Sequence, residues 1–397
     1  LAAAGLEAEA RQLIEQRLAR VPDDDEALVA RDRIGSARRA KTSRVVAFYL
    51  PQFHPTPEND LWWGKGFTEW TNAAKARPLF RDHYQPHLPA DLGHYDLRVP
   101  ETRAAQAEMA RRYGVEAFCY YHYWFGGKRL LQRPLEEVVQ SGQPDFPFCV
   151  CWANATWTGI WHGNPKRVLV EQTYPGETDY RAHFEYLLPA LRDARYLRVD
   201  GKPLLMIYKP RDLPQAPQVT ALLRRLAVEA GLPGLYLVGV SHHDGWEPAA
   251  DGFDATVVQN LPGLKARVPW RYPLLRARVR RGGLRLTVYD YRDLVDSFVP
   301  PKTRELNHLP CLIPSWDNTP RSGMNGLVLH GSTPELFRRS VRQALANVAD
   351  KPAQHRLVFL KSWNEWAEGN HMEPDLRDGH GYLEALRDEL TAAGLTT

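Results

Sequence analysis

Short apolar runs that alternate with amphipathic helix patterns constrain the fold of this chain more than any other feature. Eight runs are typical of buried strands, at residues 45–50, 115–121, 146–152, 204–208, 235–240, 255–259, 311–315 and 357–361. Helical periodicity lies between most of them, at residues 101–113, 130–140, 179–192, 218–230 and 334–347, and again at 381–393. Eight βα units in about 350 residues are typical of a (β/α)8 barrel and not of a doubly wound sheet. The sequence therefore predicts an α/β fold, a TIM barrel at residues 41–397.

The first 40 residues follow a different pattern. Leu6, Ala10, Leu13 and Leu18 recur at helical spacing, and a Pro-Asp turn at residues 22–25 separates this helix from a second one. The pair resembles the last unit of a tetratricopeptide-like array. One unit cannot bury its own apolar face. We therefore expect residues 1–40 to form a helical appendage that docks on the barrel or on another domain, with a basic, polar linker at 36–43.

The composition narrows the classes of function. A formal net charge of +4 over 397 residues does not favour nucleic-acid binding, and no apolar run reaches the length of about 18 residues that a membrane-spanning helix needs. The 12 Trp and 17 Tyr residues suit either sugar-stacking clefts or a large aromatic core. Four cysteines without Cys-x-x-Cys spacing favour reduced core thiols. With no signal-peptide pattern, we expect a cytoplasmic protein that partners could hold at a membrane.

Polar and aromatic side chains follow five of the predicted strands. Barrel enzymes place their sites at the carboxyl ends of the strands, so we expect these side chains to line one pocket. A single His or Asp of this kind is more often structural, and the argument depends on the five strand ends together. The candidate substrate-binding residues at these ends are Tyr49, His54, His122, Tyr123, Trp124, Trp152, Asn154, Trp157, Trp316 and Asp317.

A long first βα loop, residues 54–100, carries further aromatic and histidine side chains, and Trp70 is a candidate for the cleft. The spacing of His83, His87 and His94 is too irregular to predict a metal site. No Gly-rich phosphate loop or dinucleotide fingerprint occurs in the chain. We therefore expect neither a metal nor an organic cofactor.

The stretch at residues 357–373 carries the strongest indication of chemistry. An apolar strand pattern leads directly into Glu365 and Glu368, which are three positions apart and would share one side of a helical turn. Paired carboxylates are typical of glycosidic-bond chemistry, in which one group protonates a leaving oxygen and the other activates a hydroxyl. The alternative, a solvated helix face, is the commoner meaning of such a pair. The flanking candidates for substrate binding are Trp363, Asn364, His371 and Glu373.

A basic segment at residues 264–285 holds one lysine and seven arginines and no acidic residue. It is either a solvated basic helix face or a site for an anionic ligand, such as a diphosphate sugar donor or an acidic glycan. The pattern alone does not decide between the two.

Five motifs in order along the chain resemble the WbsX family of bacterial polysaccharide-biosynthesis proteins, which is similar to glycoside hydrolase family 99, the retaining endo-α-mannosidases. The resemblance implies that Glu365 is a base on the 2-hydroxyl of the sugar, which attacks the anomeric carbon to give a 1,2-anhydro sugar. It implies that Glu368 is the general acid on the leaving oxygen and then the base for the incoming group. The motifs are FYLPQFH at 48–54, WGKGFTEW at 63–70, CYYHYWF at 119–125, WDNTPR at 316–321 and WNEWAEG at 363–369.

One motif departs from the family pattern. Where the family has Trp-Ala-Asn-Glu-Asn-Trp-Thr and two arginines, this chain reads WANATWTGIW at 152–161. A carboxylate, an amide and two cations are therefore missing from this loop, which we interpret as altered substrate recognition. The sequence leaves open a retaining hydrolase, a glycosyltransferase that uses an activated sugar donor on an oligo- or polysaccharide, and a non-catalytic glycan-binding barrel.

Overall fold

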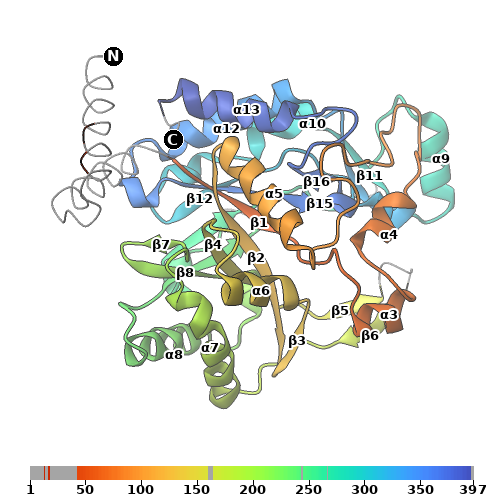
Figure 1. The fold of residues 1–397 in the computed structure, drawn as a ribbon. Helices are drawn as coiled ribbons and strands as arrows, with labels where there is room; N and C mark the ends of the chain where they lie inside the picture. The colour runs from red at the N-terminus through yellow and green to blue at the C-terminus, as the bar shows by residue number, and fades with distance from the viewer. Residues whose placement is uncertain are drawn as a thin grey trace.

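Eight parallel strands close into a barrel in the order β1, β2, β4, β8, β9, β10, β12 and β14, and β14 pairs with β1 (Figure 1). The structure, a computed structural model, describes residues 43–159, 164–242, 245–265 and 267–394, together with Leu13 and Arg17. The fold is therefore the predicted (β/α)8 barrel. The expected appendage at residues 1–40 lies outside the described residues except for Leu13 and Arg17, and the domain division stays a prediction. The barrel strands are β1 (Arg44–Tyr49), β2 (Val115–Phe125), β4 (Phe148–Trp152), β8 (Lys202–Ile207), β9 (Tyr236–Ser241), β10 (Ala255–Val258), β12 (His308–Leu312) and β14 (Leu357–Leu360).

All eight predicted strands are present, with small shifts of their ends. β12 begins at His308 and not at residue 311, and β2 continues to Phe125. The strands are almost entirely buried because side chains fill the barrel and helices cover its outer face. This explains why they are near-continuous runs of apolar and aromatic residues without alternation.

The six predicted helices surround the barrel (Figure 1). Four of them, α5, α6, α8 and α12, have a proline in the first helical turn, where the missing N–H costs no hydrogen bond. Thr333 also caps α12 by accepting from Leu336 N–H. α6 starts later than residue 130 because residues there form the strand β3, which pairs with the end of β2. The helices are α5 (Pro100–Arg112), α6 (Arg133–Ser141), α7 (Glu177–Arg192), α8 (Ala216–Glu229), α12 (Pro334–Val348) and α13 (Gly381–Ala392).

Shorter elements fill the connections. The first βα loop carries α3 (Pro57–Trp63) and α4 (Glu69–Ala74), and the loop after β4 forms a hairpin of β5 (Trp157–Gly159) and β6 (Asn164–Val170). The basic segment contains α9 (Pro273–Arg281), which precedes the parallel pair β11 (Thr287–Asp290) and β13 (Leu327–His330). The remaining elements are β3 (Lys128–Leu130), β7 (Arg198–Val199), η2 (Pro210–Asp212), η3 (Pro248–Asp251), α10 (Tyr291–Leu294), η4 (Val295–Ser297), η5 (Pro301–Arg304), α11 (Thr319–Ser322), η6 (Gly323–Asn325), η7 (Ala353–His355), β15 (Asn364–Glu365), η8 (Trp366–Glu368) and β16 (Asn370–His371).

All four cysteines are free and buried, as expected for core thiols. Among the described residues, none of the helices combines the length and the apolar character that crossing a membrane requires.

Candidate active site

The loop after β14 is anchored to the neighbouring strand β1. Trp363 N–H donates to the Phe48 carbonyl at 2.8 Å. Asn364 bonds twice to the backbone of Leu50, accepting from its N–H at 2.7 Å and donating to its carbonyl at 3.1 Å. The short ladder of β15 and β16 and the single turn of η8 complete the loop. These bonds fix the loop at the carboxyl end of the barrel, and the Asn364 side chain joins it to the backbone of Leu50, directly after β1.

Glu365 is buried in this loop and forms an ion pair with Lys361, four positions earlier. Lys361 Nζ also donates to the Tyr121 hydroxyl at 2.9 Å, so the cation is held from a second strand. Burial raises the pKa of Glu365 to about 7, against the opposing charge of Lys361 and with a further increase from the charge of Glu368. A carboxyl group with such a pKa can both accept and release a proton near neutral pH.

Glu368 shares an arginine with a second glutamate. Arg321 Nη1 pairs with Glu368 Oε1, while its Nε donates to Glu69 Oε1 at 2.8 Å and its Nη2 pairs with the same oxygen. Glu69 is completely buried, whereas the Glu368 side chain stays 17% exposed. Burial raises the pKa of Glu69, and the charge of Arg321 opposes that shift. Glu69, which belongs to the first βα loop, therefore holds in place the arginine that pairs with Glu368.

A pocket of about 200 Å³ opens beside Glu365. Its volume is below the roughly 300–1,000 Å³ of ordinary ligand pockets, so it suits one ring of a longer ligand. Flat aromatic faces contribute to its wall, and the rings of Tyr123 and Trp157 meet edge to face at 5.0 Å. The hairpin of β5 and β6, in which the family motif departs, forms one side. The lining residues are Leu50, Gln52, Trp63, Tyr123, Thr156, Trp157, Thr158, Leu169, Arg321 and Glu365.

Asp317 supports the loop that carries Glu365 and Glu368. Its Oδ2 is 2.6 Å from His83 Nε2 and accepts from Gln85 Nε2 at 2.6 Å. Its backbone N–H donates to the Glu368 carbonyl at 2.6 Å. Gly369 adopts a φ of +54°, and a Cβ there would stand 2.9 Å from Asp317 Cβ. The carboxylate of Asp317 is thus occupied by protein donors, and its contacts position the backbone of Glu368.

Several predicted pocket residues face the helix layer instead of the pocket. Trp124 Nε1 donates to Asp179 of α7 at 3.1 Å, and His122 Nε2 lies 3.0 Å from His183 Nε2 of the same helix. Trp152 packs edge to face against His183 with centroids 4.7 Å apart. Successive side chains of a strand point to opposite faces, so His122 and Trp124 cannot join Tyr123 on the inner side. Trp152 is the register partner of His122 on β4 and points to the same outer face. Their expected role in the pocket is corrected accordingly.

Two further candidates also bond to the protein. The Tyr49 hydroxyl donates to Gln106 of α5 at 2.7 Å, which places Tyr49 outside the barrel. Asn154 donates to the Lys209 carbonyl at 2.9 Å and accepts from Lys209 N–H at 2.8 Å, joining the ends of β4 and β8. Neither lines the pocket.

Three candidates belong to the packing around the loop. His54 is buried, and burial lowers its pKa to about 4. Trp70 donates to the Tyr95 carbonyl at 2.8 Å, and Trp363 is fully buried. Trp316 lies nearer the site, because Lys361 Nζ stands 5.6 Å from the centre of its ring.

His371 and Glu373 hold Trp366, which lies between the two glutamates in sequence. The His371 ring stacks on Trp366 at 3.8 Å, and Trp366 Nε1 donates to Glu373 at 2.7 Å. Glu373 also accepts from the Tyr95 hydroxyl at 2.9 Å and from Gln106 at 2.6 Å. His371 and Glu373 therefore position the turn at Trp366–Glu368 and do not line the pocket.

His87, His371 and Asp375 are buried and place one ligand atom each within 4.8 Å of the others, so they could hold a metal ion. Hydrogen bonds already account for the arrangement. His87 Nδ1 lies 2.9 Å from His371 Nε2, and His371 Nδ1 is 2.8 Å from the Glu373 carbonyl. Asp375 accepts from two backbone N–H groups that follow it. The group therefore needs no ion to satisfy its polar atoms.

The charged partners of the two glutamates are not evident from the sequence. Arg321 ends one of the family motifs, and Lys361 follows the apolar run of β14, yet neither position alone indicates a contact with a carboxylate. Glu69 lies 252 positions from Arg321. An apolar strand that ends in lysine, four positions before a glutamate, was the one available signal.

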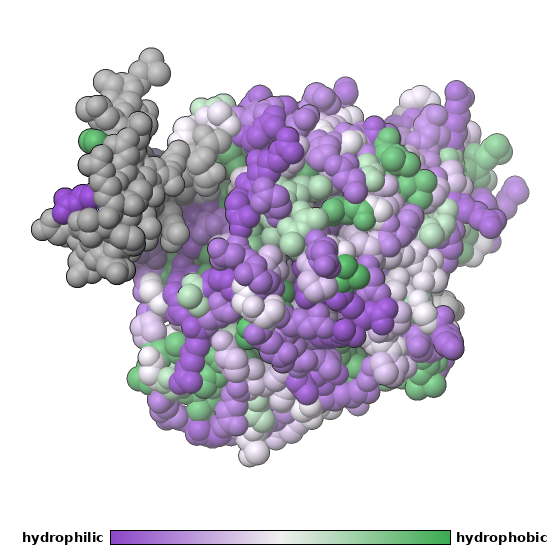
Figure 2. All heavy atoms as spheres, in the orientation of Figure 1, coloured by the Kyte–Doolittle hydropathy of each residue, from purple (hydrophilic) through white to green (hydrophobic). Residues whose placement is uncertain are grey.

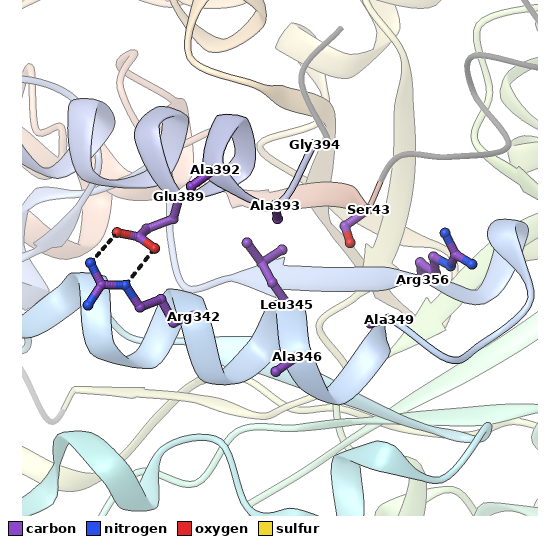
Figure 3. Close-up of a pocket in the computed structure, with 10 residues that line it drawn as sticks. All are labelled: Ser43, Arg342, Leu345, Ala346, Ala349, Arg356, Glu389, Ala392, Ala393 and Gly394. Carbon is purple, nitrogen blue, oxygen red and sulfur yellow. Dashed lines mark hydrogen bonds and ion pairs between the residues drawn. The ribbon is translucent and has the colours of Figure 1, made fainter. Parts of the chain in front are cut away.

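A larger pocket, of about 590 Å³, lies between α12 and α13 (Figure 3). Small apolar side chains and an ion pair of Arg342 with Glu389 line it. Ser43, which precedes β1, also lines it, so it lies at the opposite end of the barrel from the carboxylates. We assign the candidate site to the smaller pocket because Glu365 lines it and Glu368 belongs to the same loop.

Comparisons with known proteins agree with this fold and give the family of the chain. A family model described as "Glycosyltransferase WbsX" matches residues 45–386. Two proteins from strains of Xanthomonas campestris pv. campestris, each named "Uncharacterized protein WxcX", are 42% identical over 354 residues. The alignments cover 88% of this chain and 50% of each relative, so the chain spans about half the length of the curated relatives it matches.

Solved structures of carbohydrate-active enzymes share the fold. A glycoside hydrolase family 99 endo-α-mannosidase from Bacteroides thetaiotaomicron, in complex with bis-tris-propane, superposes with a TM-score of 0.55 at 14% identity, covering 89% of this chain and 97% of that one. A "glycoside hydrolase-like protein" gives 0.55 at 15% identity, covering 88% and 94%. At such identities the likeness shows the barrel alone.

Proposed function

The chain belongs to the WbsX glycosyltransferase family, and from this premise we propose that this carbohydrate-active enzyme cleaves or transfers at a glycosidic bond with retention of configuration. The observation that carries the proposal is the position of Glu365. It lies in the wall of a pocket with aromatic faces, in a loop that also presents Glu368 and is fixed at the carboxyl end of the barrel. We further propose that the substrate is part of a bacterial surface polysaccharide.

In the first step, Glu365 accepts the proton of the sugar 2-hydroxyl, and the oxygen attacks the anomeric carbon to form a 1,2-anhydro sugar. The bond to the leaving oxygen breaks as Glu368 donates its proton. In the second step, Glu368 accepts a proton from water or a sugar hydroxyl, which opens the three-membered ring, and Glu365 returns its proton to the 2-oxygen. Two inversions at one carbon give net retention.

The charged neighbours fit these roles. The pKa of about 7 lets Glu365 take up and return a proton near neutral pH, while Lys361 stabilises its carboxylate form. Arg321 stabilises the Glu368 carboxylate, the form needed in the second step. Glu69 shares the charge of Arg321 with Glu368, because it accepts from two N–H groups of that arginine.

A second candidate function is non-catalytic glycan binding. The observation in its favour is that both Glu365 and Glu368 are ion-paired within the protein, which is compatible with a structural role. The pocket beside Glu365 would then bind a sugar ring, and no glycosidic bond would be cleaved.

Incubation with mannose-containing glycans and with activated sugar donors, followed by mass spectrometry of the products, tests the proposal. Hydrolysis adds water across one bond, transfer yields an extended glycan, and binding alone leaves all masses unchanged. The Glu365→Gln variant is the matched control because it keeps the side-chain shape and removes the base. Turnover that persists unchanged in this variant contradicts the assignment.

A further inference from the structure

The basic segment at residues 264–285 exposes apolar and cationic side chains together. Three large apolar side chains of this segment are exposed, Leu264 by 52%, Trp270 by 82% and Leu274 by 86%. Neighbouring Leu275 and Val279 are buried against the core, so α9 is anchored by one face and presents the other outward. α9 lies at the periphery of the molecule (Figure 1), and Figure 2 shows apolar and hydrophilic surface mixed over this corner.

Most of the arginines in this segment form no ion pair with an acidic side chain among the described residues. Arg271 pairs with Asp290, and the Arg267 guanidinium lies 5.2 Å from the centre of the Tyr289 ring. Within the described part of the chain, no acidic side chain lies within ion-pair distance of the other five arginines, which are exposed: Arg276, Arg278, Arg280, Arg281 and Arg285. A partner for this surface must therefore carry many negative charges.

The segment lies on the same side of the barrel as the candidate site. The Tyr272 ring packs against Phe80 with centroids 5.0 Å apart, and Phe80 stacks on His83 at 4.4 Å. His83 contacts Asp317, whose N–H binds the Glu368 carbonyl. A short series of packed residues thus joins the basic segment to the catalytic loop.

We propose that residues 264–285 bind the surface of an anionic lipid bilayer, with Trp270 and Leu274 at the level of the headgroups and the unpaired arginines against lipid phosphates. Arginines beside an exposed indole and leucine are the side chains that peripheral membrane proteins present to a bilayer. A small soluble diphosphate would need a concave site, and the arginines of the segment line neither the pocket beside Glu365 nor the pocket between α12 and α13. A nucleic acid or an acidic glycan would not explain the exposed leucines.

Co-sedimentation of the full chain with vesicles tests this proposal. We expect binding to vesicles of phosphatidylcholine and phosphatidylglycerol in equal parts, little binding to pure phosphatidylcholine, and weaker binding as salt rises from about 0.1 M to about 1 M. Absence of binding to the anionic vesicles overturns the proposal. So does stronger binding to heparin or DNA with none to vesicles, because the segment would then be a general polyanion site.

Two double variants with the same change in charge separate the segment from net charge. Arg278→Gln with Arg281→Gln should weaken vesicle partitioning roughly 25-fold, since each arginine contributes about fivefold. The control is Arg112→Gln with Arg192→Gln, which changes exposed residues at the C-terminal ends of α5 and α7. These helix ends lie at the opposite end of the barrel from the candidate site, so partitioning should stay within about twofold of the wild type. Equal loss in both variants contradicts a specific surface.

Trp270→Ala and Leu274→Ala test the apolar contribution. Both side chains are more than four-fifths exposed, so the fold should not depend on them. We expect the pair of changes to remove the binding that persists at high salt, while Val228→Ala, on an exposed site of α8, has no effect. An unchanged salt-resistant fraction would contradict insertion of these residues. The assay needs no sugar substrate, so its outcome is independent of the proposed function.

Discussion

Lys361 forms an ion pair with Glu365 inside the carboxyl end of the barrel, and both side chains are almost completely buried. Two opposing effects meet at this carboxyl group. Burial raises the pKa of Glu365, and the lysine charge lowers it. The lysine therefore sets how much of the glutamate is available as a base at a given pH.

We predict that Lys361→Met moves the acidic limb of the pH profile to higher pH. The base form of Glu365 rises with pH through its pKa of about 7, so kcat/KM of the wild type should rise across that range. Removing the lysine removes the charge that lowers this pKa, so the limb should shift upward and activity should recover partly in alkaline buffer. Lys351→Met, a buried lysine that donates to the His308 carbonyl, is the control. An unshifted limb in Lys361→Met contradicts the role of Glu365 as base.

The two glutamates should fail in different ways. We predict that Glu365→Gln and Glu368→Gln each lower kcat by on the order of 10² or more, since an amide keeps the shape but cannot carry out the proton transfer. A substrate with a good leaving group should partly rescue the first step of Glu368→Gln, because protonation then matters less. No leaving group should rescue Glu365→Gln, and a 2-deoxy substrate should be inert with the wild type. Rescue of both variants to the same degree would argue against separate roles.

Alanine substitutions of Trp157 and Trp124 should affect different properties, substrate binding in the first case and stability of the fold in the second. Trp157 lines the pocket and is partly exposed, so we predict that Trp157→Ala raises KM with little change in the free energy of unfolding. Trp124 is buried against α7, so Trp124→Ala should destabilise the fold by roughly 3–5 kcal/mol. Steady-state kinetics and denaturant unfolding measure the two effects. A large KM effect from Trp124→Ala beyond its loss of folded protein would return that residue to the site.

The strand order of the barrel follows from sequence because each buried strand is a separate apolar run between helices. Whether an individual side chain points into the barrel or toward the helices is harder to predict from sequence. Residues 120–124 are aromatic or histidine throughout, so the alternation that distinguishes the inner from the outer face is absent, and Tyr123 and Trp124 looked equivalent. β12 was placed three residues late because His308 and Pro310 are atypical of a buried strand.

The candidate site was predictable where its residues share one segment and obscure where they do not. Glu365 and Glu368 follow a single strand, and their spacing together with the adjacent Trp363 and Trp366 favours paired carboxylates of a site. Their cations depend on tertiary contacts, since Arg321 reaches both Glu368 and Glu69 from a different strand end. Long side chains from separate loops can meet in many ways, and a single sequence does not specify which.

Arg321 offers the sharpest test of the shared charge. We predict that Arg321→Met destabilises the protein by about 3–5 kcal/mol at neutral pH, because Glu69 then stays buried without its cation. The pKa of Glu69, already raised by burial, should rise further above its unfolded value of about 4.3. Between the unfolded and the folded pKa of Glu69, the folded variant binds more protons than the unfolded chain. The free energy of unfolding of Arg321→Met should therefore increase as pH falls through this range and decrease as pH rises.

The double variant Glu69→Gln with Arg321→Met separates this effect from catalysis. It removes the buried charge together with its partner, so denaturant unfolding at neutral pH should recover most of the stability lost in Arg321→Met. Activity should stay low, on the order of 10²-fold below the wild type, because Glu368 still lacks the cation that stabilises its carboxylate in the second step. Recovery of activity together with stability would show that Arg321 serves the fold alone.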